Sequence, residues 1–215
     1  MQDIIWPTKT DGTRYTDKIV LNRPSLLNYL DCESASPLRT TIADIIDKNN
    51  CKNIIDVGCG QGHINDLVCI DNYMGFDPDS RSVRHAKKRY AHEDNIEFRN
   101  CGWGNDSDIQ VEFEVDCLMF VGVLSYAIPE YPEIFKTNGW HYDAFNRLCK
   151  LYNPKIVIIQ EILQEQTHIV DSNELRTLDL HYYKQFKHKY YELDLPIWCG
   201  HRAILEIDGD SINVQ

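Results

Sequence analysis

Short apolar runs alternate with amphipathic segments through the middle of the chain. Runs apolar enough to form buried strands are predicted at 52–57, 72–77, 96–99, 115–121 and 155–160. Apolar residues recur at helical spacing before or between these runs, at 36–50, 63–68, 79–90 and 140–152. Strands that alternate with helices form mainly parallel sheets covered on both faces, so this pattern predicts a three-layer α/β sandwich.

The C-terminal part of the chain departs from this alternation. Asp171 and Glu174 resemble a capping box and predict a helix over 171–186. Two further strands, 190–195 and 202–207, are too close in sequence for a crossover helix, so they form a hairpin. We therefore expect a mainly parallel seven-stranded sheet with a C-terminal antiparallel hairpin strand.

A glycine-rich turn after the first predicted strand is the most distinctive stretch. Residues 53–62 read Asn-Ile-Ile-Asp-Val-Gly-Cys-Gly-Gln-Gly, with a carboxylate at Asp56. Such a turn lets backbone approach a ligand closely, and a following helix offers free N–H groups to it, as in Rossmann-like units. A dinucleotide fingerprint needs a glycine where His63 stands, so an NAD-type oxidoreductase is disfavoured. Asp56 favours an ammonium group over a pyrophosphate.

The stretch resembles the first motif of the class I S-adenosylmethionine (SAM)-dependent methyltransferases, and the resemblance covers roughly residues 38–208. It implies SAM as cofactor, with Asp56 holding its ammonium group directly or through a water. It also implies that Asp77, followed by Pro78, accepts both ribose hydroxyls. The remaining residues of the turn that the resemblance assigns to the cofactor are Gly58, Cys59, Gly60 and Gly62. Two simpler interpretations stay open. Asp56 only caps the glycine turn, or Asp77 only places a negative charge at the N-terminus of the following helix.

Two further segments fall where the family contacts SAM. The family has an acid after its third strand that binds the adenine amino group, but none stands here, so Asn100 or backbone near Cys101 and Gly102 would serve instead. Trp103 either stacks on adenine or is a core aromatic. After the fourth strand, backbone at Val121 and Gly122 would contact the methionine part of SAM, unless Gly122 only marks a bend.

Methyl transfer from a sulfonium is a direct displacement, so the protein mainly aligns the reactants and excludes water. An oxygen acceptor also needs a base, and the candidates after the fourth and fifth strands are His141, Glu161 and His168. No metal site is expected, because no acidic cluster has metal-ligand spacing. The favoured function is O-methylation of a sugar or another small polar metabolite. The alternatives are a non-catalytic SAM-binding partner subunit and a methyltransferase that acts on RNA or protein.

The amino-acid composition limits which classes of binding partner are expected. The formal net charge is −11, from 22 basic and 33 acidic residues, which argues against binding driven by phosphate neutralisation. The basic run at 81–89 is read as the solvated face of a helix. No membrane segment is expected, because the longest apolar run, 117–128, is too short to cross a bilayer. Eight cysteines without a C-x-x-C pair indicate a reduced, cytoplasmic protein.

These observations predict one methyltransferase domain at 36–208. Residues 1–35 are predicted to form an extension that covers the acceptor site as a lid, and 209–215 a frayed tail. The expected partner is a small-molecule acceptor, with nucleic acid disfavoured. A homodimer is compatible with the sequence, which does not distinguish it from a monomer.

Overall fold

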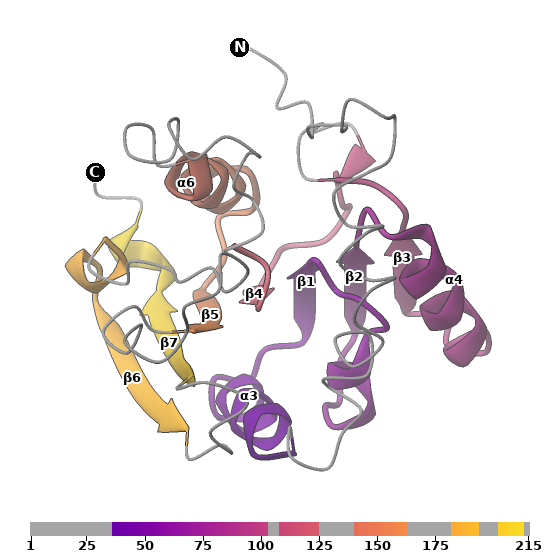
Figure 1. Cartoon of the computed structure of the whole chain (residues 1–215), viewed down its shortest axis with the longest axis horizontal. Helices are drawn as coiled ribbons and strands as arrows, with labels where there is room; N and C mark the ends of the chain where they lie inside the picture. The colour runs from indigo at the N-terminus through magenta and orange to yellow at the C-terminus, as the bar shows by residue number, and fades with distance from the viewer. Residues whose placement is uncertain (1–35, 103–107, 125–139, 163–181, 194–201, 213–215) are drawn as a thin grey trace, which may run out of the picture.

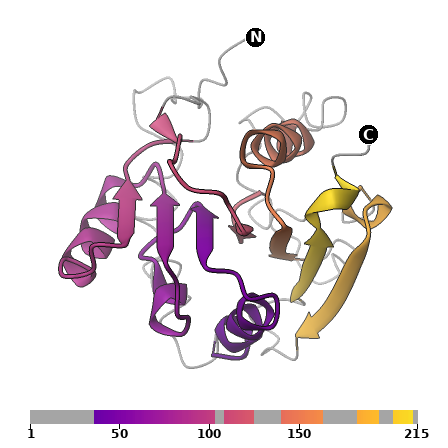
Figure 2. The ribbon, with the colours of Figure 1, turned by 180° about the vertical axis from the view of Figure 1, so that it is seen from behind.

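The computed structural model describes residues 36–102, 108–124, 140–162, 182–193 and 202–212. Within these residues the chain forms a seven-stranded sheet in the order β3-β2-β1-β4-β5-β7-β6 (Figures 1 and 2). The strands are β1 Asn53–Val57, β2 Asn72–Phe76, β3 Ile96–Arg99, β4 Cys117–Val121, β5 Ile156–Ile162, β6 His188–Leu193 and β7 Arg202–Asp208. β1 to β5 pair in parallel, whereas β7 is antiparallel to both β5 and β6. The predicted fold class, with its antiparallel C-terminal strand, is confirmed.

Helices cover both faces of the sheet. The α-helices are α3 Ser36–Lys48, α4 Ser80–Arg89 and α6 Trp140–Tyr152, and the short 3-10 helices are η2 His63–Asp66, η6 Tyr183–Gln185 and η8 Gly209–Ser211. One core cluster joins α3 and α4 to strand residues such as Ile54. The other joins Phe145 of α6 to strand residues such as Ile55. Neighbouring strand residues enter opposite clusters because side chains alternate across a sheet, which gives the three layers.

The helix predicted over 63–68 is wrong. Only the single turn η2 forms there, closed by bonds from the Asn65 amide to the Gly62 carbonyl and from the Leu67 amide to the Ile64 carbonyl. Ile64 is buried, but Leu67 is 46% exposed, so the segment lacks the continuous apolar face of a longer helix. The helix N–H groups expected beside the glycine turn are therefore limited to one turn.

Two predictions about the C-terminal part also fail in detail. The helix predicted over 171–186 does not continue to residue 186. Its described residues form a turn and the short helix η6, and Phe186 has extended backbone before β6. The tail is not frayed at 209–212: the buried Gly209 donates its amide to the Lys155 carbonyl at 2.9 Å, which ties η8 to the start of β5. The predicted extension 1–35 lies outside the described residues. No helix in the described ranges is long and apolar enough to cross a bilayer.

Candidate cofactor site

The candidate site lies at the carboxyl edge of the sheet, where β1 has β2 on one side and β4 on the other. Chain connections leave in opposite directions at such a point, which opens a crevice where α/β sheets bind ligands. The glycine turn is tied to the end of β2, because the amides of Gly58 and Cys59 both donate to the Phe76 carbonyl, at 2.8 and 3.3 Å. The turn therefore sits directly above the β1–β2 edge.

The glycines of the turn differ in what surrounds them. Gly58, Gly60 and Gly62 all have left-handed backbone, with φ of 69°, 54° and 72°. A Cβ at Gly58 would lie 2.2 Å from a methyl group of Val123, so this glycine allows the turn to pack against the segment after β4. A Cβ at Gly60 would meet nothing within 4 Å. Gly60 thus borders open space.

Asp56 lies beneath this turn and is 4% exposed. Its carboxylate accepts a 2.7 Å hydrogen bond from the Tyr73 hydroxyl on β2. Burial raises the pKa of Asp56 to about 7, although the Tyr73 bond acts in the opposite direction. A buried carboxylate with a raised pKa gains stability from a cationic ligand, which supplies the charge that its surroundings lack.

Asp77 follows β2 and contacts the glycine turn. One carboxylate oxygen accepts the Gly60 amide at 3.0 Å, and the other accepts the Asp79 amide at 2.7 Å. Burial raises the pKa of Asp77 to about 6, partly offset by these two bonds. Each oxygen keeps a further lone pair, so the carboxylate can still accept two hydroxyl donors side by side. The helix start at α4 is capped by Asp79, which leaves Asp77 for another role.

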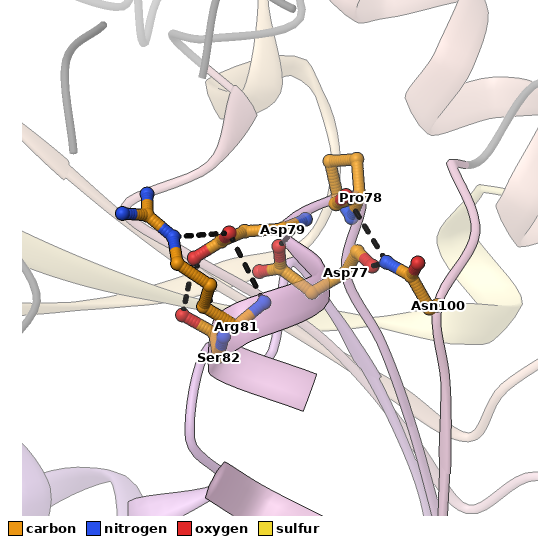
Figure 3. A network of polar contacts seen from close by, with 6 residues as sticks. All are labelled: Asp77, Pro78, Asp79, Arg81, Ser82 and Asn100. Atoms are coloured by element: carbon orange, nitrogen blue, oxygen red, sulfur yellow. Dashed lines mark hydrogen bonds and ion pairs between the residues drawn. The ribbon is translucent and has the colours of Figure 1, made fainter. Parts of the chain in front are cut away.

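The segment after β3 contacts the backbone that follows β2. Asn100 donates its side-chain amide to the carbonyls of Asp77 and Pro78 (Figure 3). Cys101 is half-buried, and burial raises the pKa of its thiol to about 11, so it is no thiolate nucleophile. Gly102 is half-buried beside it. The structure thus places the Asn100 side chain against the backbone of Asp77 and Pro78, and the predicted role of residues 100–102 at the adenine stays a prediction.

On the β4 side, Val121 ends the strand and Gly122 follows with φ of 65°. The Gly122 amide donates to the Gln160 carbonyl of β5 at 2.8 Å, which continues the parallel ladder by one residue. Both residues are half-buried at the carboxyl edge. Together with the Gly58–Val123 packing, this places the end of β4 beside the glycine turn.

Sequence reasoning missed the contacts that hold the turn from the α4 side. Tyr90 donates to the Gly62 carbonyl at 2.9 Å and to the Asp66 carboxylate at 2.8 Å. Arg89 forms an ion pair with Asp66 and contacts Nδ1 of His63 at 3.0 Å. These pairs join segments that are more than twenty residues apart, and no local pattern in the sequence announces them.

The other predicted site residues fall outside what the structure describes. Trp103 and His168 lie outside the described residues, and so do the side chains of His141, in α6, and Glu161, in β5. The three candidate bases therefore stay predictions. Among the described residues, no three His, Cys, Asp or Glu side chains gather as a metal site requires.

Comparison with known proteins finds solved structures with a similar fold but no curated protein with a similar sequence. No protein-family model matches the chain, and no curated protein is similar to it in sequence. The N-methyltransferase NodS from Bradyrhizobium japonicum WM9, solved in complex with S-adenosyl-L-homocysteine (SAH), is similar with a TM-score of 0.65 at 10% identity, over 83% of this chain and 88% of NodS. The methyltransferase domain of bacterial CtHen1 has a TM-score of 0.57 at 14% identity, over 82% of this chain and all of that domain.

A third similar structure is the bifunctional kinase-methyltransferase WbdD, with a TM-score of 0.54 at 16% identity, over 83% of this chain but only 40% of WbdD. The similarity to these structures, the strand order and the glycine turn all indicate the same fold. The chain has the fold of the class I SAM-dependent methyltransferases. At such low sequence identities the similarity shows only the fold, and the evidence for an activity and an acceptor lies in the residues of the site.

Proposed function

We propose that the chain binds SAM and transfers its methyl group to an acceptor. One observation carries this: the buried carboxylate of Asp56 and the half-buried carboxylate of Asp77 lie beside a glycine turn that borders open space at the carboxyl edge of the sheet, where β2 and β4 flank β1. The two ends of SAM that need carboxylates are an ammonium group and a ribose diol. The residues present fit both.

Each part of the cofactor has residues of matching chemistry. Asp56 would hold the ammonium group, since burial without a cation is costly for it. Asp77 would accept the ribose hydroxyls with the lone pairs that Gly60 and Asp79 leave. Asn100 or the backbone at Cys101 and Gly102 would face the adenine, with Trp103 as a stacking partner. Val121 and Gly122 would lie along the methionine part, where a glycine allows close backbone approach.

When bound, SAM supplies a methyl group already activated by the positive charge on sulfur. The chain then has to hold the acceptor in line with that methyl group and keep water out. We propose a small polar acceptor, most simply a sugar hydroxyl. His141, Glu161 or His168 would take the proton from that hydroxyl, because an uncharged alcohol is a weak nucleophile.

Titration with SAH by calorimetry tests the cofactor, with D56N and D77N as site variants and K150E on the exposed outer face of α6 as a control. Wild type and K150E should bind SAH alike, and each site variant should bind at least about ten-fold more weakly. Absence of binding by wild type at millimolar SAH would refute the proposal. Methyl consumption with sugars and sugar nucleotides then separates an enzyme from a SAM-binding subunit that lacks activity.

One observation favours a second acceptor class, RNA. Arg84, Lys87 and Lys88 are exposed on α4, and none of the ion pairs within the described part of the chain involves them. A Hen1 protein is also part of an RNA repair complex, Pnkp1/Rnl/Hen1, and one chain of that structure resembles this chain with a TM-score of 0.53 at 13% identity, over 92% of this chain and 49% of that one. Short RNA that binds with an affinity falling steeply with salt, and only weakly to K87E/K88E, would favour this acceptor over a sugar.

A further inference from the structure

Two asparagines bracket strand β3, and each donates its side-chain amide to the neighbouring β2 side of the sheet. Asn95, before the strand, donates to the Ile70 carbonyl at 2.9 Å. Asn100, after the strand, donates to two carbonyls, those of Asp77 at 3.0 Å and Pro78 at 3.1 Å. The first contact lies at the amino edge of the sheet and the second at the carboxyl edge, beside the candidate cofactor site.

The Asn100 contacts hold the backbone at Asp77 and Pro78. Pro78 has no N–H, so the Asp77–Pro78 peptide can be held only through its carbonyl. The Asp77 amide donates to the Arg99 carbonyl at 3.1 Å, and Asn100 supplies the donor for the carbonyls on the other side. Three contacts from residues 99 and 100 thus fix the backbone from which the Asp77 carboxylate projects.

Figure 3 shows how these groups lie around Asp77. The Asn100 nitrogen faces the two carbonyls, and its oxygen points away from them. An aspartate at this position would instead bring a negative oxygen against two carbonyl oxygens, which repel it. The geometry therefore favours an amide over a carboxylate at position 100.

We propose that Asn100 is a positioning residue that holds the Asp77 carboxylate in the orientation needed to grip the ribose of SAM. The inference rests on the proposed SAM binding, and it assigns Asn100 a role that acts through Asp77. Without the amide, the Asp77 and Pro78 carbonyls lose the Asn100 contacts. The backbone that carries the carboxylate then shifts, and the two oxygens no longer present their free lone pairs to adjacent hydroxyls as well as before. Binding is then lost because the carboxylate is misplaced, even though it is still present.

The test is SAH titration by calorimetry with N100A, N100D and the matched control N95A. N95A also deletes one side-chain bond to a carbonyl, but at the opposite edge of the sheet. N100A should weaken SAH binding about ten-fold, N100D at least as much, and N95A by less than about two-fold. Thermal denaturation of all three variants shows whether each is folded, and N100S provides a smaller change if N100A is not.

A double-mutant cycle with D77N distinguishes positioning from a general loss of stability. If Asn100 acts through Asp77, N100A should cost little further affinity in the D77N background, so the two losses should not add. Additive losses would overturn the proposal, as would an N100D variant that binds SAH as well as wild type, since an acid would then serve as an adenine acceptor. Failure of wild type to bind SAH is a separate result that refutes the proposed function itself.

Discussion

Tyr73 and Asp56 form a buried pair across β1 and β2, with the tyrosine hydroxyl 2.7 Å from a carboxylate oxygen. The two residues lie on adjacent strands, and Asp56 is in register with Gly75, two positions beyond Tyr73. Burial leaves Asp56 with a pKa of about 7, so its charge state changes within the physiological range. The pair therefore links pH, stability and ligand binding at one site.

The first prediction is that SAH affinity depends on the charge of Asp56. Its carboxylate must be ionised to hold an ammonium group, so affinity should rise as pH increases through about 7. D56N should bind at least about ten-fold more weakly above this pH and should lose that rise, keeping only a step near 6 from Asp77. Calorimetric titrations between about pH 5 and about pH 8.5 measure both profiles; parallel profiles would contradict the prediction.

The same substitution should stabilise the ligand-free protein. Because the folded pKa of Asp56 is raised from 3.8 to about 7, the folded state loses stability as pH rises across this interval. D56N removes that penalty, and its amide oxygen can still accept from Tyr73. We expect a free energy of unfolding about 1–3 kcal/mol above wild type near pH 8 and a smaller gain near pH 5. Urea denaturation at the two pH values tests this.

The hydroxyl of Tyr73 should tune the pKa of its partner. Its bond to Asp56 favours the ionised form, so Y73F should raise the pKa of Asp56 further and move the rise in SAH affinity to higher pH. Loss of the bond should also cost about 1–3 kcal/mol of stability above neutral pH, since the carboxylate stays buried. Measuring SAH affinity against pH for Y73F and wild type tests this prediction. A midpoint at the same pH in both proteins would contradict it.

Gly58 and Gly60 should respond differently to alanine. In G58A the new methyl group would lie 2.2 Å from Val123, so overpacking adds to left-handed strain and the loss should reach about 3 kcal/mol. In G60A only the strain remains, about 1–2 kcal/mol, but the methyl group occupies the open space and should weaken SAH binding. Thermal denaturation and SAH titration of both variants separate the two effects; equal behaviour would argue against open space at Gly60.

Asp116 offers a prediction about stability alone. It is buried at the amino edge, where its carboxylate accepts the amides of Lys52 and Asn53 at 2.8 and 2.9 Å and pairs with Lys155. Burial raises the pKa of Asp116, but these three partners together outweigh it and hold the pKa below 3.8. D116N should cost about 2–4 kcal/mol near neutral pH, with SAH affinity unchanged.

The pH dependence of that cost follows from the sign of the shift. The stabilisation by Asp116 is present above its ordinary pKa of 3.8 and is lost as pH falls through its lower folded value. The difference in unfolding free energy between wild type and D116N should therefore shrink in acid. A difference that stays constant down to low pH would show that the ion pair is not what stabilises the edge.

Elements with strong local patterns could be predicted from the sequence. β4 is a continuous apolar run and β1 is mostly apolar. α3 and α6 have apolar residues at helical spacing and clear ends, so the positions of these four elements agree with the structure to within a few residues. The segment 63–68 failed because its apolar residues are too few to decide between one turn and a longer helix. In the structure, Asp66 at the end of this single turn pairs with Arg89 and accepts a hydrogen bond from Tyr90.

The amino-acid sequence by itself determined the sheet, the glycine turn and the presence of carboxylates at 56 and 77, because strand burial, turn geometry and residue spacing are local properties. Only the tertiary structure decided what those carboxylates contact. The Tyr73 hydroxyl and the Gly60 amide reach the carboxylates from positions 17 residues away, and Asn100, 23 residues from Asp77, donates to the backbone carbonyl of that residue. Such contacts depend on strand order and on which face each side chain takes, and these are settled only when the whole sheet is assembled.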